Sequence, residues 1–142
     1  MNTIRSMALI LVLMLPIMTM STVYTPVSIE TLLENSTGVI HGTYLGRKYK
    51  KIHTGEVVTE IILKPLGISG MAQSEIVNVN EISIHVLGGE WQGVTYHAQG
   101  APRFKPNEEV IIAVSKKGSQ LWIQSHGLGK YRVIKKGKKK IV

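Results

Sequence analysis

The segment EISIHVL at residues 81–87 decides the fold class, because its polar and apolar side chains alternate from Glu81 to Val86. Successive side chains of a β-strand point to opposite faces, so Ile82, Ile84 and Val86 should all point into one core. The same alternation places His85 on the exterior of the predicted strand. Two glycines follow directly and favour a turn, since glycine accepts the positive φ that tight turns require.

Similar segments recur on both sides at intervals of about ten residues. They span residues 39–45, 56–66, 91–98, 109–115, 120–125 and 130–134. The first two should pair as an antiparallel hairpin through a basic loop at residues 47–55, and Pro65 and Gly67 should end the second strand. Residues 67–80 are rich in small and polar side chains and indicate a long loop with an edge strand at residues 74–79.

This pattern predicts an all-β protein, a small closed or partly open antiparallel barrel of about five to seven strands. The same parity assigns Ile61, Ile112 and Val114 to the core. One short helix should precede the barrel within residues 28–38, with Ser28 as its cap. Its apolar face would consist of Ile29, Leu32 and Leu33.

The amino-terminal residues 1–22 are typical of an export signal. Arg5 precedes an apolar run at residues 7–18, which is followed by small residues suited to a signal peptidase. That run is shorter than the ~20 residues of a membrane-spanning helix, so we expect a cleaved signal and a periplasmic or extracellular protein. The alternative is a signal retained as an anchor. The chain has no cysteine, so packing and backbone pairing must supply its stability.

The net charge of +8 is concentrated near the carboxyl terminus. Between residues 21 and 129, nine basic side chains balance nine glutamates. The excess after Gly129 comes from Lys130, Arg132, Lys135, Lys136, Lys138, Lys139 and Lys140. We therefore expect a signal at residues 1–22, a barrel domain at 23–134 and a solvated basic tail at 135–142. Such a tail can contact polyanions without being a specific reader of nucleic acid.

The sequence contains no complete catalytic or metal-binding constellation. Its five histidines follow no metal-ligand spacing, although His85 and His97 have the parity of a surface pair. The chain has no aspartate, which removes the usual orienting carboxylate of a catalytic triad. Ser125 and His126 are adjacent, so on an extended chain they point to opposite faces. We therefore predict no enzyme activity, no metal and no cofactor.

The segment GGEWQGVTYHAQGAPRFKPNEEVIIAV, residues 88–114, resembles a block of small exported bacterial proteins of unassigned function. The phrases at residues 32–46 and 59–67 are similar to the opening of the same family. The resemblance implies an oligonucleotide/oligosaccharide-binding barrel, of the kind also used by tissue inhibitors of metalloproteinases and netrin modules. Those inhibitors require an amino-terminal cysteine, so their metal chelation does not carry over to this chain.

Within that block, Phe104 should plug one end of the barrel. Arg103 should either pair with Glu108 or Glu109 or present its guanidinium to a carboxylate ligand. Aromatic and basic side chains also suggest a binding face. For both tryptophans, however, packing in the core or at its rim is the favoured interpretation. The candidate binding residues are Trp91, Tyr96, Arg103, Lys48, Lys50, Lys51, Lys138, Lys139 and Lys140.

These observations favour a non-catalytic binding or interaction module of the cell envelope. Its partner should be a protein or an anionic envelope polymer. The alternatives are an inhibitor or accessory protein of a co-exported protease, or a hydrolase. A concave polar pocket that gathers at least two of His85, His97, His126 and a glutamate would favour these alternatives.

Overall fold

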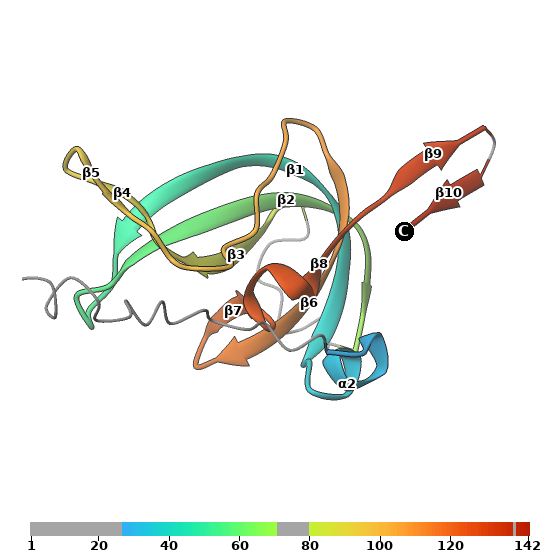
Figure 1. Ribbon diagram of the computed structural model, residues 1–142, viewed down its shortest axis with the longest axis horizontal. Coiled ribbons are helices and arrows are strands. Elements are labelled where there is room, and N and C mark those ends of the chain that lie inside the picture. Colours follow the sequence, from blue (N-terminus) through green and yellow to red (C-terminus); the bar gives the residue numbers. More distant parts are fainter. Residues whose placement is uncertain (1–26, 71–79, 138) are drawn as a thin grey trace, which may run out of the picture.

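The computed structural model describes residues 27–70, 80–137 and 139–142 (Figure 1). The predicted signal at residues 1–22, the edge strand at 74–79 and the candidate Lys138 lie outside the described residues. No helix of the described part is long and apolar enough to cross a membrane.

The main sheet closes into a ring of five strands, which confirms the all-β, barrel-like prediction. The strands are β1 (Gly38–Lys51), β2 (Val57–Ser69), β3 (Ile82–Leu87), β6 (Glu109–Lys117) and β7 (Gln120–Ile123). Their spatial order is β1-β2-β3-β7-β6, and β6 pairs back onto β1. The β3–β7 pair is parallel and the other ring pairs are antiparallel. A short strand β8 (Lys130–Arg132) pairs with β6.

The described residues also form several smaller elements besides the ring. They are α2 (Ile29–Glu34), the hairpin β4 (Gly89–Trp91) and β5 (Val94–Tyr96), the 3-10 turn η2 (His126–Gly129), and the hairpin β9 (Ile134–Lys136) and β10 (Lys139–Ile141). Figure 1 shows the two hairpins extending from opposite sides of the barrel.

The helix begins where it was predicted, because the Ser28 side chain accepts a hydrogen bond from the Thr31 backbone N–H at 3.2 Å. Its expected apolar face is only partly used: Leu32 is buried, but Ile29 and Leu33 are exposed.

The core follows the predicted parity. Fully or nearly fully buried side chains line the inside of the ring, and they include Ile61, Ile84, Val86, Ile112 and Val114. Ile82 belongs to the same cluster. Because strands from every part of the ring contribute to it, this cluster holds the barrel together.

The prediction of a basic loop at residues 47–55 is wrong for its first five residues, because residues 47–51 continue strand β1. Each of these residues pairs with β2, and the cationic Lys48 lies directly opposite Glu60. Only the tip turns, where Ile52 N–H donates to Glu56 O at 2.9 Å and Gly55 has φ +87°. Cross-strand charge pairing therefore extends a strand that composition alone marks as a loop.

Pro65 and Gly67 do not end the second strand, because β2 runs on to Ser69. Pro65 lies opposite Gly42, at an irregularity of the β1–β2 register. The described pairing of β2 with β3 covers Val58 to Leu63, so Pro65 lies beyond it and no bond to β3 is lost there.

Residues 91–98 form no single strand but part of the β4–β5 hairpin. Gln92 and Gly93 occupy its tip with φ of +51° and +78°. Positive φ at both central residues is the geometry of the favoured two-residue hairpin turn. Gly88 and Gly89 have the predicted positive φ, +87° and +141°, and lie where the chain leaves β3 and enters β4.

His85 is buried, with 4% of its surface exposed, although its parity predicted an exterior position. It lies on the outer face of β3, next to Trp122 on the parallel strand β7. The two rings are 5.4 Å apart, so this part of the outer face is covered. His97 is exposed, and the predicted surface pair of His85 and His97 does not form.

Candidate functional site

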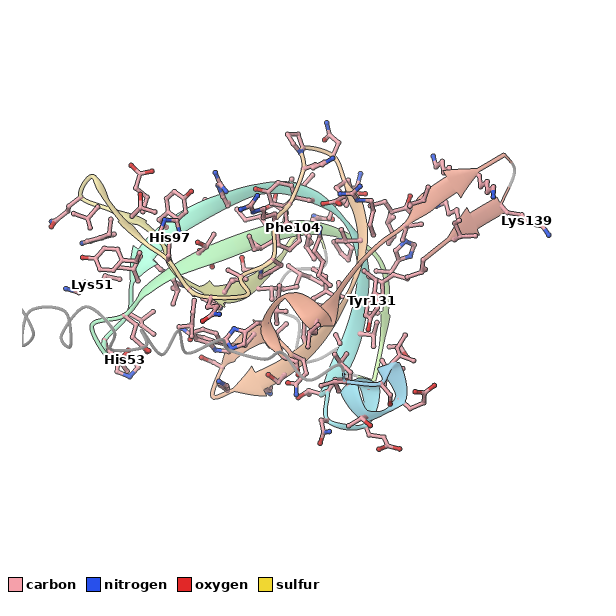
Figure 2. The ribbon with its side chains drawn as sticks, in the orientation of Figure 1. Lys51, His53, His97, Phe104, Tyr131 and Lys139 are labelled. Atoms are coloured by element: carbon pink, nitrogen blue, oxygen red, sulfur yellow. The ribbon has the colours of Figure 1, made fainter. Side chains whose placement is uncertain are left out.

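A cleft of about 460 Å³ opens where the β1–β2 hairpin extends beyond the barrel core. One wall comes from the inner face of this hairpin, and the other comes from residues 88–104. Figure 2 shows His97 and Phe104 on the second wall, with Lys51 and His53 near the tip of the hairpin. Small-molecule sites commonly have volumes of this order.

A bulge in β1 sets which side chains enter the cleft. Tyr44 pairs with Leu63 and the next paired residue is Gly46, so Leu45 has no partner on β2. The extra residue reverses the alternation, and Arg47 and Tyr49 therefore continue the inner face that Tyr44 occupies. Both line the cleft, and the Arg47 guanidinium lies 5.5 Å from the centre of the Tyr49 ring.

The same alternation turns Lys48 and Lys50 away from the cleft. The Lys50 ammonium lies 3.6 Å from a carboxylate oxygen of Glu60. Lys48 is exposed, as is Lys51 near the hairpin tip. None of these three candidate lysines lines the cleft.

Two glycines bring the opposite wall close to β1 and β2. Gly88 has φ +87°, and its amide donates to Val57 O at 2.9 Å. The Thr59 hydroxyl donates to Gly88 O at 2.7 Å. A Cβ on Gly89 would lie 2.7 Å from the Tyr49 ring and from the Thr59 hydroxyl, so only glycine fits there.

Phe104 closes the inner end of the cleft, in agreement with its predicted packing role. Its ring stacks on Tyr44, with centres 5.1 Å apart, and contacts the core cluster. The Lys130 ammonium lies 4.6 Å from the Phe104 ring centre and donates to Arg103 O at 2.7 Å. These contacts fix the backbone that carries Arg103.

The predicted ion pair of Arg103 with Glu108 or Glu109 does not form. Glu108 instead accepts hydrogen bonds from Lys130 at 2.8 Å and from Arg132. Glu109 is bound by His41 at 2.8 Å and by Lys140 at 2.7 Å. With these carboxylates occupied, the Arg103 guanidinium is exposed at the cleft and has no ion-pair partner among the described residues.

Of the candidate binding residues, the structure brings Tyr96 and Arg103 together in the cleft. Trp91 ends β4 half-buried and does not line it, and Lys139 and Lys140 belong to the distant β9–β10 hairpin. The candidate binding residues did not include Arg47, Tyr49 and Glu90, which also line the cleft. For Arg47 and Tyr49, the available signal was Gly46, because a glycine within a strand often marks a bulge, and a bulge changes which side chains face inward.

A second, smaller pocket of about 150 Å³ contains His85 and His126. The His85 Nδ1 atom lies 3.2 Å from Leu121 O. Burial, and to a smaller degree the charge of Lys50, lowers the pKa of His85, which favours the neutral ring. This pocket gathers two of the histidines but has no glutamate, while the larger cleft combines His97 with Glu90.

The described residues contain no group of three or more histidine, cysteine, aspartate or glutamate side chains that could hold a metal ion. Comparison with protein-family models, with curated proteins and with solved structures finds no match to this chain.

Proposed function

We propose that this chain is an exported, non-catalytic binding module of the cell envelope, and that its cleft binds a carboxylate-bearing unit of an anionic partner. One observation carries the proposal: Arg47 and Arg103, which have no carboxylate partner among the described residues, line the same cleft as the half-buried Tyr49 and the exposed Tyr96. A guanidinium donates two parallel hydrogen bonds to a carboxylate, so these side chains suit an acidic ligand.

The tyrosines add a second kind of contact. Tyr49 and Tyr96 come from opposite walls, and each offers a flat apolar ring with a polar hydroxyl. Sugar rings and planar groups bind to such surfaces. The cleft therefore combines charge recognition with stacking, which favours an acidic sugar unit over a simple inorganic anion.

The strand arrangement supports the same proposal. Oligonucleotide/oligosaccharide-binding barrels use the face of their second and third strands for ligands. In this chain Thr59 and Ile61 of β2 and Val86 of β3 line the cleft. The resemblance of residues 88–114 to exported bacterial proteins remains part of the proposal, and this segment forms most of one wall.

Replacement of Arg103 by glutamine should weaken binding of an acidic oligosaccharide by about 10- to 100-fold, because a hydrogen bond to a charged group contributes about 1.5–3 kcal/mol. We expect the same direction for Arg47→Gln. Calorimetric titration with oligogalacturonate would measure the change, with hexaglutamate and neutral galactan as comparison ligands. Preference for hexaglutamate would identify the partner as an acidic peptide.

Lys48→Gln is the matched control. It removes the same charge from the residue next to Arg47 but on the opposite face of β1, so it should change the affinity less than twofold. Equal losses in Lys48→Gln and Arg47→Gln would contradict a cleft-specific site and leave only general charge attraction. Absence of binding to every acidic ligand would refute the proposed function.

Export makes a separate prediction. Mass spectrometry of the protein isolated from its native host should find an amino terminus between residues 22 and 26, because small residues after the apolar run suit signal peptidase. A soluble species that starts at Met1 would contradict export.

A further inference from the structure

The described residues of the predicted basic tail, 135–137 and 139–142, are exposed, and most of them belong to a hairpin that begins at Ile134. Ile134 pairs with Ile141, Lys135 with Lys140 and Lys136 with Lys139. Gly137, with φ +64°, begins the short connection between the strands. Figure 2 shows the hairpin projecting from the barrel with Lys139 at its outer end.

The two faces of this hairpin differ. Directly opposed residues of an antiparallel pair share a face, so Lys135 and Lys140 lie on one side. The Lys140 ammonium contacts Glu109 at 2.7 Å, which turns this side toward the barrel. The other side carries Ile134, Ile141, Lys136 and Lys139, and these residues are exposed. We call this second side the outer face of the hairpin.

The outer face combines exposed apolar surface with like charges. Ile134 and Ile141 are 51% and 44% exposed and lie side by side. The next pair, Lys136 and Lys139, places two positive charges opposite each other, an arrangement that destabilises an isolated hairpin. Contact with a negatively charged surface removes this repulsion, and an apolar layer behind that charge buries the isoleucines.

We propose that the outer face of the β9–β10 hairpin docks onto an anionic lipid bilayer. A soluble polyanion pairs with the lysine charges but leaves the isoleucines exposed to water. The bilayer interface offers anionic headgroups for the lysines and, just below them, acyl chains that bury the isoleucines. Lysine side chains extend to the headgroups while neighbouring apolar groups enter the interface. This inference does not depend on the cleft or its ligand.

The absence of cysteine permits a site-specific test in the full chain. Ile141→Cys carries a polarity-sensitive fluorophore on the outer face, and Ser119→Cys carries it in the exposed turn after β6. With vesicles of phosphatidylglycerol and phosphatidylcholine, the label at position 141 should shift to shorter wavelength and the label at position 119 should not. Pure phosphatidylcholine vesicles should give at most a weak shift at position 141.

Charge variants in the Ile141→Cys background test the lysines. Lys136→Gln with Lys139→Gln should raise the anionic lipid concentration at half-maximal shift by about 30-fold, at ~1 kcal/mol per lysine. Lys48→Gln with Lys64→Gln removes the same charge from exposed positions of β1 and β2. This control pair should change the lipid concentration at half-maximal shift less than threefold. A chain without a label that carries both Ile134→Ser and Ile141→Ser tests the isoleucines. Anionic vesicles should protect the Lys139 amine of the wild-type chain from an amine-reactive reagent, and this protection should be lost in the double variant.

The labels report the hairpin itself, so lipid contact by residues 7–18 does not imitate the result. A shift at position 119 equal to that at position 141, or no shift with anionic vesicles, would overturn the proposal. A shift produced equally by soluble polyglutamate would assign the outer face to polyanions instead. A shift that depends only on protein concentration would assign it to self-association.

Discussion

Replacement of Ile84 by alanine should lower the free energy of unfolding by about 2–5 kcal/mol. Ile84 is fully buried at the centre of β3, between the pairs formed with Ile61 on β2 and Leu121 on β7. Removal of its outer carbons leaves a cavity inside a closed ring, where the backbone of the neighbouring strands limits collapse. Urea denaturation followed by circular dichroism measures the change.

Ile112→Ala should give a loss of the same size, since Ile112 is also fully buried within the core cluster. Ile111→Ala is the matched control, because Ile111 is the preceding residue of β6 and points to the opposite, partly exposed face. Its loss should be clearly smaller. If Ile84→Ala and Ile112→Ala each cost less than 1 kcal/mol, the assignment of the inner face would be wrong.

Replacement of Glu108 by glutamine should cost about 3–5 kcal/mol, because it leaves buried positive charge without a partner. The Glu108 carboxylate accepts hydrogen bonds from Lys130 at 2.8 Å, from the Lys105 backbone N–H at 3.0 Å and from Arg132. The Lys130 side chain is itself only 10% exposed. Denaturation at neutral pH, with Glu34→Gln as the control at an exposed position, measures the effect.

Glu108 also predicts an acid-dependent loss of stability. Burial alone would raise the pKa of Glu108, but the hydrogen bonds from Lys130, the Lys105 amide and Arg132 outweigh it and lower the pKa from 4.5 to about 2. The folded state therefore binds the proton less readily than the unfolded state. The resulting contribution, about 3 kcal/mol, is complete above pH 4.5 and is lost as the pH falls toward 2.

The acid dependence separates this ion cluster from ordinary packing. Wild-type protein should lose stability steeply between pH 4.5 and 2, whereas Glu108→Gln should show a flatter profile over that interval. Parallel profiles for the two proteins would mean that Glu108 is not the group responsible.

The sequence predicted the barrel because its core strands alternate. Ile82, Ile84 and Val86 show the period of a half-buried strand, and their burial follows directly from it. The prediction failed where a strand is built from polar and basic residues, which are typical of loops. Residues 47–51 are almost entirely basic or polar, yet they extend β1, because their partners on β2 supply the missing β-preference.

His85 illustrates a second limit. Its parity was assigned correctly to the outer face, but the parallel neighbour Trp122 covers that face. Parity within one strand says nothing about what another strand brings beside it. Burial of an outward side chain therefore requires the sheet order, which local patterns do not contain.

In the candidate site, too, residue types could be predicted from the sequence, whereas contacts between distant segments could not. Arg103 and Tyr96 were identified by residue type within a segment rich in turns, and both line the cleft. The pairing of Arg103 with Glu108 was wrong because Lys130 and Arg132, which flank Tyr131 on β8, occupy the carboxylate. Lys48, Lys50 and Lys51 were candidates within a predicted loop, but residues 47–51 belong to β1, and the bulge at Leu45 turns Lys48 and Lys50 away from the cleft.

Closure of the ring also constrains the order in which the chain can fold. The β1–β2 hairpin joins neighbouring segments, so it can form as soon as both strands exist. Strand β6 must then return to β1 across a long stretch of chain, as the contact between His41 and Glu109, 68 residues apart, illustrates. Such distant pairing is slow because the chain entropy is lost before the contacts are gained. Until β6 arrives, the edge of β1 lacks its ring partner and is open to other chains, so the risk of aggregation is concentrated in this late interval.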